Sequence, residues 1–151
     1  MPYRVRGAAE ADIPWMLGGL RGAARWADLP DLYPDPEYAK ERILEALKPP
    51  HILIVAELDS CKPVGFLGAY VVPHIYNPRI MWSTVAVWWV DLEYRLSRAA
   101  LMLLNSYVRL ASQTCRYVTV ALGWHTPIKE ASLLKRGFKL LERSYTLRVE
   151  E

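Results

Sequence analysis

The stretch WWVDLEYRLSRAAL, residues 88–101, joins three kinds of local sequence. It begins at the end of a long apolar run, residues 79–90, which predicts a central strand buried on both faces. A short polar turn follows, and from Ser97 to about Ser112 apolar residues recur at the spacing of an amphipathic helix. The stretch therefore predicts a strand, a turn and the start of a helix.

This arrangement is suited to binding an anion. The first backbone N–H groups of a helix lack intrahelical partners and carry the positive end of the helix dipole. Arg95 and Arg98 add positive charge at the same place. The alternative is that both arginines are solvated residues of the first helical turn, the usual position of arginine.

The rest of the chain supplies a small set of strands and helices. Upstream, the patterns predict a strand at residues 3–6, a helix capped by Asp12, a second helix at 36–47 capped by Asp35, and a hairpin of strands 51–58 and 63–72. Downstream, they predict a strand at 117–122, a third long helix that starts at Thr126 and stops at Gly137, and a closing strand at 139–149.

This element order predicts an α/β (α+β) fold with a mixed, mainly antiparallel sheet and helices on both faces, in one domain spanning residues 1–151. The strands at 79–90 and 117–122 should be parallel, because the connection between them contains a helix.

Composition excludes several other classes of protein. Hydrophobic residues make up 52% of the chain, too many for a disordered protein. There is no apolar run long enough to span a bilayer and no apolar signal peptide, so we expect a cytoplasmic protein without membrane contact. The two cysteines and three histidines lack metal-ligand spacing, and a net charge of +3 with dispersed basic residues gives no reason to expect nucleic-acid binding.

The residues 95–100, Arg-Leu-Ser-Arg-Ala-Ala, resemble the motif Arg/Gln-x-x-Gly-x-Gly/Ala of the GCN5-related N-acetyltransferase (GNAT) superfamily. The preceding strand that ends in Val90 and the closing Leu133-Leu134-Lys135-Arg136-Gly137-Phe138 agree with it, and the likeness covers nearly the whole chain. A narrower resemblance is to compact phage-encoded acetyltransferase-like proteins, which share the paired tryptophans and a final Ser-Tyr strand.

The resemblance implies the acyl-CoA N-acyltransferase fold and transfer of an acetyl or other acyl group from acetyl-CoA to a primary amine of a small molecule or peptide, without a metal. It implies acceptor contacts from residues 26–35 and 73–79, with Asp28, Asp31, Asp35, Trp26 and Tyr33 suited to a cationic amine. It is also consistent with a homodimer. The cofactor-binding residues that it implies are Trp88, Trp89, Val90, Arg95, Leu96, Ser97, Arg98, Ala99, Ala100 and Thr126.

Three positions depart from the family pattern. Arg98 replaces a glycine, so that its side chain either pairs with a phosphate or obstructs the groove. Leu133 stands where many members have a proton-donating tyrosine, and Val85 stands near the position of a general base. Thr126 either contacts the pantetheine arm or caps its helix. The substitutes for the base are Asp91, Glu93, Glu57 and His125, and none is singled out. The alternative function is a catalytically inactive GNAT-fold protein that acts as a binding or assembly module.

Overall fold

A five-stranded sheet forms the centre of the computed structural model, which describes residues 2–33, 35–123 and 126–150. The strands follow one another in chain order across the sheet, as β1 (Tyr3–Gly7), β2 (Ile52–Leu58), β3 (Pro63–His74), β4 (Asn77–Val90) and β5 (Tyr117–Thr119). The first four pair antiparallel, and β4 and β5 pair parallel. The predicted hairpin and the predicted parallel pair are both confirmed.

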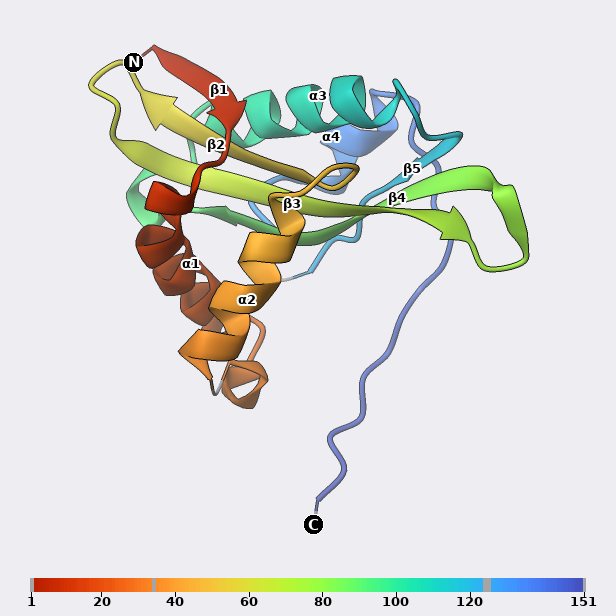
Figure 1. The fold of residues 1–151 in the computed structure, drawn as a ribbon, viewed down its shortest axis with the longest axis horizontal. Helices are drawn as coiled ribbons and strands as arrows, with labels where there is room; N and C mark the ends of the chain where they lie inside the picture. Colours follow the sequence, from red (N-terminus) through yellow and green to blue (C-terminus); the bar gives the residue numbers. More distant parts are fainter. Residues whose placement is uncertain (1, 34, 124–125, 151) are drawn as a thin grey trace.

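Helices cover both faces of this sheet (Figure 1). On one face lie α1 (Ile13–Trp26) and α2 (Pro36–Ala46), and on the other lie α3 (Ala99–Ala111) and α4 (Glu130–Leu134). Short 3-10 turns, η1 (Glu10–Asp12), η2 (Pro30–Leu32) and η3 (Leu92–Tyr94), stand in the connections. Asp35 caps α2 as predicted, since its carboxylate accepts from the backbone N–H groups of Glu37 and Tyr38 at 2.9 and 3.3 Å.

Each helical layer buries its own hydrophobic core against the sheet. Under α3, the fully buried Leu103, Leu104 and Tyr107 belong to the same cluster as Trp88 and Val90 of β4. Under α1, Met16 and Phe66 pack in a second cluster with Trp89. Successive residues of β4 therefore serve opposite cores, because strand side chains alternate between the two faces.

Three expectations about element extent are wrong. β4 is buried on both faces only at Trp88, Trp89 and Val90, because its first half forms a hairpin with β3 that projects past the helices (Figure 1). The third long helix is reduced to the five residues of α4. Residues 139–149 form no strand, and Figure 1 shows the C-terminal end of the chain running away from the sheet. Among the described helices, none has both the length and the apolar character that crossing a bilayer requires.

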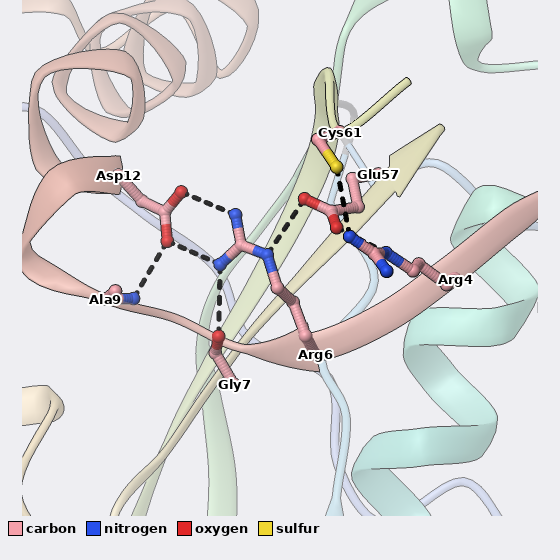
Figure 2. A network of polar contacts seen from close by, with 7 residues as sticks. All are labelled: Arg4, Arg6, Gly7, Ala9, Asp12, Glu57 and Cys61. Carbon is pink, nitrogen blue, oxygen red and sulfur yellow. Dashed lines mark hydrogen bonds and ion pairs between the residues drawn. The ribbon is translucent and has the colours of Figure 1, made fainter. Parts of the chain in front are cut away.

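A network of ion pairs fastens β1 to β2 and to the start of α1 (Figure 2). The Arg6 guanidinium donates to both carboxylate oxygens of Asp12 at 2.8 Å and to Glu57 at 2.8 Å, and Arg4 donates to the other oxygen of Glu57 at 2.5 Å. Asp12 also accepts from the backbone N–H of Ala9 at 2.8 Å. Asp12 precedes α1 but makes no side-chain cap bond to it, contrary to the prediction, because its carboxylate is committed to Arg6 and Ala9.

We expect Glu57→Gln to lower the free energy of unfolding by about 2–3 kcal/mol near pH 7, because the buried amide cannot accept two charged hydrogen bonds. Hydrogen bonding to Arg6, followed by that to Arg4, holds the pKa of Glu57 below its ordinary value of 4.5 despite burial. The stabilising effect is therefore complete above pH 4.5 and is lost as the pH falls through the lower pKa of the folded state.

Denaturant titrations of both proteins between about pH 7 and pH 3 measure this difference. The gap in stability between wild type and Glu57→Gln should narrow once the pH drops below 4.5. A gap that stays constant over the whole range would contradict an ionised Glu57 in the folded state.

Candidate functional site

The sheet opens between β4 and β5. Only three residues of β4 pair with β5: Trp82 with Tyr117, Ser83 with Val118, and Thr84 with Thr119. β4 continues for six more residues to Val90, and in the described part of the chain no strand pairs with this section on the β5 side. This section of β4 is therefore unpaired on one side, although Trp88, Trp89 and Val90 within it are buried.

A β-bulge stands where the two strands separate. The pairing of β3 with β4 moves from Ala69–Val85 to Gly68–Val87, so that Ala86 is an extra residue on β4. Such a bulge bends its strand and increases the local twist. The bend helps to direct β4 away from β5, and the sequence contained no glycine or proline at this point that would have signalled it.

Three hydrogen bonds fix the last paired residues. The Tyr107 hydroxyl lies 2.9 Å from the Ser83 hydroxyl and donates to the Thr119 carbonyl at 3.1 Å, while the Thr119 hydroxyl donates to the Ser83 carbonyl at 2.8 Å. Burial raises the pKa of Tyr107 to about 12, so the phenol stays neutral. One buried side chain of α3 thus connects β4 and β5 at the point where they begin to diverge.

The turn after β4 leads directly into α3. The Asp91 N–H donates to the Val64 carbonyl at 2.8 Å, which keeps the start of the turn beside β3. The Ser97 hydroxyl donates to the Tyr94 carbonyl at 2.6 Å and accepts from the Ala99 N–H at 3.3 Å. Ser97 therefore closes the turn before α3, whose N-cap residue is Arg98, and α3 begins two residues later than predicted. The helix N-terminus lies at the end of the strand that borders the opening.

The residues predicted to bind the cofactor fall into two groups. One group is buried and comprises Trp88 (2% exposed), Trp89, Val90, Ala99 and Ala100. Leu96 and Arg98 are exposed, and Arg95 and Ser97 are half-buried. Ala99 and Ala100 pack in the core below α3, where small side chains let the helix start lie close to the sheet.

Arg95 is stacked between two tryptophans. Its guanidinium carbon lies 4.7 Å from the ring centre of Trp26, at the end of α1, and 4.7 Å from that of Trp89. Trp89 in turn donates its indole N–H to Asp91 at 3.0 Å. Burial lowers the pKa of Arg95, and Asp91 opposes this effect. The guanidinium of Arg95 therefore lies between the end of α1 and β4, whereas the side chain of Arg98 is exposed beside the start of α3.

The residues considered as acid or base are mostly engaged elsewhere. Glu57 belongs to the ion-pair network of β1, Glu93 lies 3.6 Å from the exposed Lys62, and Asp91 accepts from Trp89. His125 lies outside the described residues. Val85 and Leu133 have no ionisable group, and Leu133 is buried in the core under α3.

Thr126 closes a turn and does not cap α4, contrary to one of its two predicted roles. Its hydroxyl accepts from the Gly123 N–H at 2.8 Å, and its own N–H donates to the Gly123 carbonyl at 3.2 Å. The residue that precedes α4 is Lys129, which makes no side-chain cap bond. Among the described residues, no three potential metal-ligand side chains of the histidine, cysteine or carboxylate type lie together.

The two segments predicted to contact the acceptor lie at different ends of the molecule. Residues 73–79 form the tip of the β3–β4 hairpin, where Ile75 and Tyr76 are exposed, and this tip lies far from η2 in Figure 1. In the other segment Asp35 is used as a cap, Trp26 stacks on Arg95, and the exposed Asp31 lies 3.6 Å from the Arg148 guanidinium.

Comparison with known proteins shows the fold. No protein-family model and no curated protein matches this sequence. Among solved structures, a protein from Clostridium acetobutylicum, described as a predicted acetyltransferase with acetyl-CoA, superposes with a TM-score of 0.76 at 12% identity and covers 97% of this chain and 96% of its own. An aminoglycoside acetyltransferase from an uncultured soil metagenomic sample has a TM-score of 0.66 at 18% identity, and the match covers 100% of this chain and 99% of the acetyltransferase.

A ribosomal-protein-alanine N-acetyltransferase from Brucella melitensis biovar Abortus 2308 has a TM-score of 0.71 at 17% identity, and the match covers 99% of this chain and 100% of the acetyltransferase. At these sequence identities the structural similarity shows the fold alone. The chain has the mixed α/β GNAT acyl-CoA N-acyltransferase fold, as the sequence predicted. The narrower resemblance to phage proteins stays a prediction.

Two glycines of α1, Gly19 and Gly22, leave space for the Trp89 ring, and this contact was not predicted from the sequence. A Cβ added to Gly22 would lie 2.6 Å from the Trp89 ring, and one added to Gly19 would lie 2.9 Å from it and 2.5 Å from Phe66. The spacing of these glycines, three residues apart on one helix, was the available signal for close packing. Glycine costs helix stability, so its presence at both positions reflects the need for space.

We expect Gly22→Ala to destabilise the protein by about 1–3 kcal/mol through overpacking, although alanine is the better helix former. Trp89 cannot easily move aside, because Arg95 stacks on it and Asp91 holds its N–H. Gly18→Ala is the matched control, since a Cβ there meets nothing within 4 Å, and it should stabilise α1 by about 0.5–1 kcal/mol. Thermal or denaturant unfolding measures both changes. Equal effects of the two substitutions would contradict a fixed Trp89.

Proposed function

We propose that this protein is an N-acetyltransferase of the GNAT type, which transfers an acetyl group from acetyl-CoA to a primary amine. The observation that supports this most is the opening between β4 and β5 immediately before the N-terminus of α3. An exposed strand edge followed by a helix N-terminus suits a ligand that has peptide-like amides at one end and phosphates at the other.

Different residues of the motif would bind different parts of acetyl-CoA. The backbone edge of residues 85–90 would pair with the amides of the pantetheine arm, so Trp88, Trp89 and Val90 contribute main chain rather than side chain. The N–H groups at the start of α3, near Ser97 to Ala100, would face the pyrophosphate. Arg98 is exposed there and would pair with a phosphate rather than obstruct the groove. Leu96 and Thr126 would border the site.

Arg95 has a different part in this proposal. Its guanidinium lies between the rings of Trp26 and Trp89, so we assign it to positioning the turn against α1. The stacking links the end of the helix before η2 to the strand that borders the opening. Arg95 therefore remains a residue of the site, but as a support for the cofactor-binding backbone.

The chemistry needs few side chains. The amine nitrogen attacks the thioester carbonyl, the C–S bond breaks, and the CoA thiolate leaves while the amine loses its proton to solvent or to the thiolate. Holding amine and carbonyl together provides most of the acceleration, and backbone N–H groups can stabilise the oxyanion. A missing general acid or base costs roughly 10²- to 10⁴-fold. Val85 and Leu133 are compatible with a slow transferase.

The acceptor is proposed only as a primary amine of a small molecule or peptide. Solved structures with this fold include aminoglycoside acetyltransferases, one of them in complex with sisomicin, and a ribosomal-protein-alanine N-acetyltransferase. Asp28 and Asp31 near η2 offer negative charge for a cationic amine. We propose a cytoplasmic location on the composition of the chain.

Calorimetric titration with acetyl-CoA tests the cofactor site. We expect the wild type to bind, and Arg98→Ala to bind about 10- to 100-fold more weakly, because a charged hydrogen bond contributes about 1.5–3 kcal/mol. Arg109→Ala is the matched control, since it removes an equally exposed arginine from the last turn of the same helix and should leave affinity unchanged.

The other outcomes have defined meanings. Tighter binding by Arg98→Ala or Arg98→Gly would show that this side chain obstructs the groove. If the wild type gives no heat and no thermal shift at millimolar acetyl-CoA, the proposed function is wrong, and the inactive binding module becomes the better account of the fold.

A further inference from the structure

The two helical layers of the molecule carry opposite charge. Residues 94–139, which include α3 and α4, hold eight lysines or arginines and one carboxylate, that of Glu130. Residues 10–48, which include α1 and α2, hold five basic residues and eight carboxylates. Figure 1 shows these two pairs of helices on opposite faces of the sheet. The net charge of +3 therefore combines a basic face with an acidic face.

A contact between α3 and the residues after α4 brings two arginines together on the basic face. Arg109, in the last turn of α3, is exposed and stands one helical turn after the exposed Asn105. Arg136 donates from Nε to the Asn105 side-chain oxygen at 2.9 Å and from Nη1 to the Ser132 carbonyl at 2.8 Å. These two bonds hold the guanidinium of Arg136 on the outer side of α3, beside Arg109.

Two further cations flank this pair. Lys135 is exposed at the C-cap of α4, next to Arg136, and Arg116 is exposed just before β5, shortly after α3 ends. Arg109, Arg116, Lys135 and Arg136 are called here the basic cluster. In the described part of the chain, none of the four forms an ion pair with a carboxylate. The fold thus gathers residues that are dispersed in the sequence, and it leaves their charges uncompensated.

The helices that carry this charge offer no apolar anchor beside it. Together α3 and α4 expose one large apolar side chain, Leu134, and no aromatic ring, because Tyr107 is fully buried. The centre of a protein interface and the insertion of a helix into a membrane both use aromatic or apolar side chains. Binding of a single strand uses aromatic rings on which bases stack. The phosphate backbone of a nucleic-acid duplex requires only cations and hydrogen-bond donors.

We propose that the basic cluster binds the phosphate backbone of duplex nucleic acid, without sequence preference. Arginine pairs with phosphate oxygens through two parallel hydrogen bonds, and Arg136 is already held in place on α3. The cluster lies at the C-terminal end of α3, whereas Arg98 stands at its N-cap, eleven residues or about 16 Å from Arg109 along the helix. The surface is therefore separate from the site proposed for acetyl-CoA, and this inference does not depend on acetyl transfer.

Fluorescence anisotropy with a labelled DNA duplex of mixed sequence, about 20 base pairs long, measures this binding. We expect a micromolar dissociation constant at about 50 mM salt. Four phosphate contacts predict that the logarithm of the association constant falls with the logarithm of salt concentration with a slope of about −3 to −4. Binding should therefore weaken about 100-fold between about 50 and 200 mM salt. A second duplex of unrelated sequence should bind equally well.

A pair of matched double variants locates the binding surface. Arg109→Gln with Lys135→Gln removes two exposed cations of the basic cluster and should reduce the steepness of the salt dependence by about two units. The control, Arg25→Gln with Lys40→Gln, removes an exposed arginine and an exposed lysine from α1 and α2, and should leave the salt dependence unchanged. Because both variants have the same net charge, equal weakening in the two would overturn the proposal.

Four other results would also overturn it. The first is an unchanged anisotropy at about 50 mM salt with about 100 µM protein, well above the expected dissociation constant. The second is tighter binding to a single strand of the same length, which indicates base stacking. The third is displacement of the duplex by excess acetyl-CoA, which places the duplex at the start of α3. The fourth is sedimentation with phosphatidylserine vesicles that the Arg109→Gln, Lys135→Gln variant loses, which assigns the cluster to a membrane. Titration of that variant with acetyl-CoA tests the cofactor site separately and should match the wild type.

Discussion

The short pairing of β4 with β5 is the constraint on which the rest of the site depends. The two strands share three residue pairs, and Tyr107 fastens the last of them by contacting Ser83 on one strand and Thr119 on the other. A fourth or fifth pair would close the opening and remove the free edge of residues 85–90. The buried phenol holds the two strands together between Ser83 and Thr119, and the bulge at Ala86 lets β4 turn away after them.

The same strand also connects the two cores. Trp88 and Val90 pack under α3, and Trp89 between them packs against Gly19 and Gly22 of α1. Arg95 then extends this second core to Trp26, at the end of α1. The backbone beside the opening is thus held from both layers, although the opening itself is bordered by few polar side chains. Rigid main chain can substitute for side-chain contacts when the ligand is recognised by amides and phosphates.

Local patterns predicted the elements that local forces determine. Asp35 caps α2, the segments β2 and β3 pair antiparallel as expected, and the apolar stripe of α3 is buried. Thr126-Pro127 was misleading, because a threonine before a proline serves a turn as well as a helix start, and here its hydroxyl binds Gly123. The stacking of Arg95 on Trp26 could not be predicted, since it joins residues far apart in sequence, and nothing local to either residue specifies it. The anion site at Arg95 and Arg98 stays a prediction, and the two arginines have different surroundings, because Arg95 stacks on tryptophans while Arg98 is exposed.

The strand expected at residues 139–149 fails for a related reason. Alternation of apolar and polar residues reports that a segment can be half-buried in a sheet, but it does not say which edge the segment will meet. After the cap at Gly137, residues 139–145 border a cavity beside β5 without pairing with it, and the end of the chain then runs away from the sheet (Figure 1). The free edge of β4 and the outer edge of β5 are also different surfaces, one facing the opening and one facing outward.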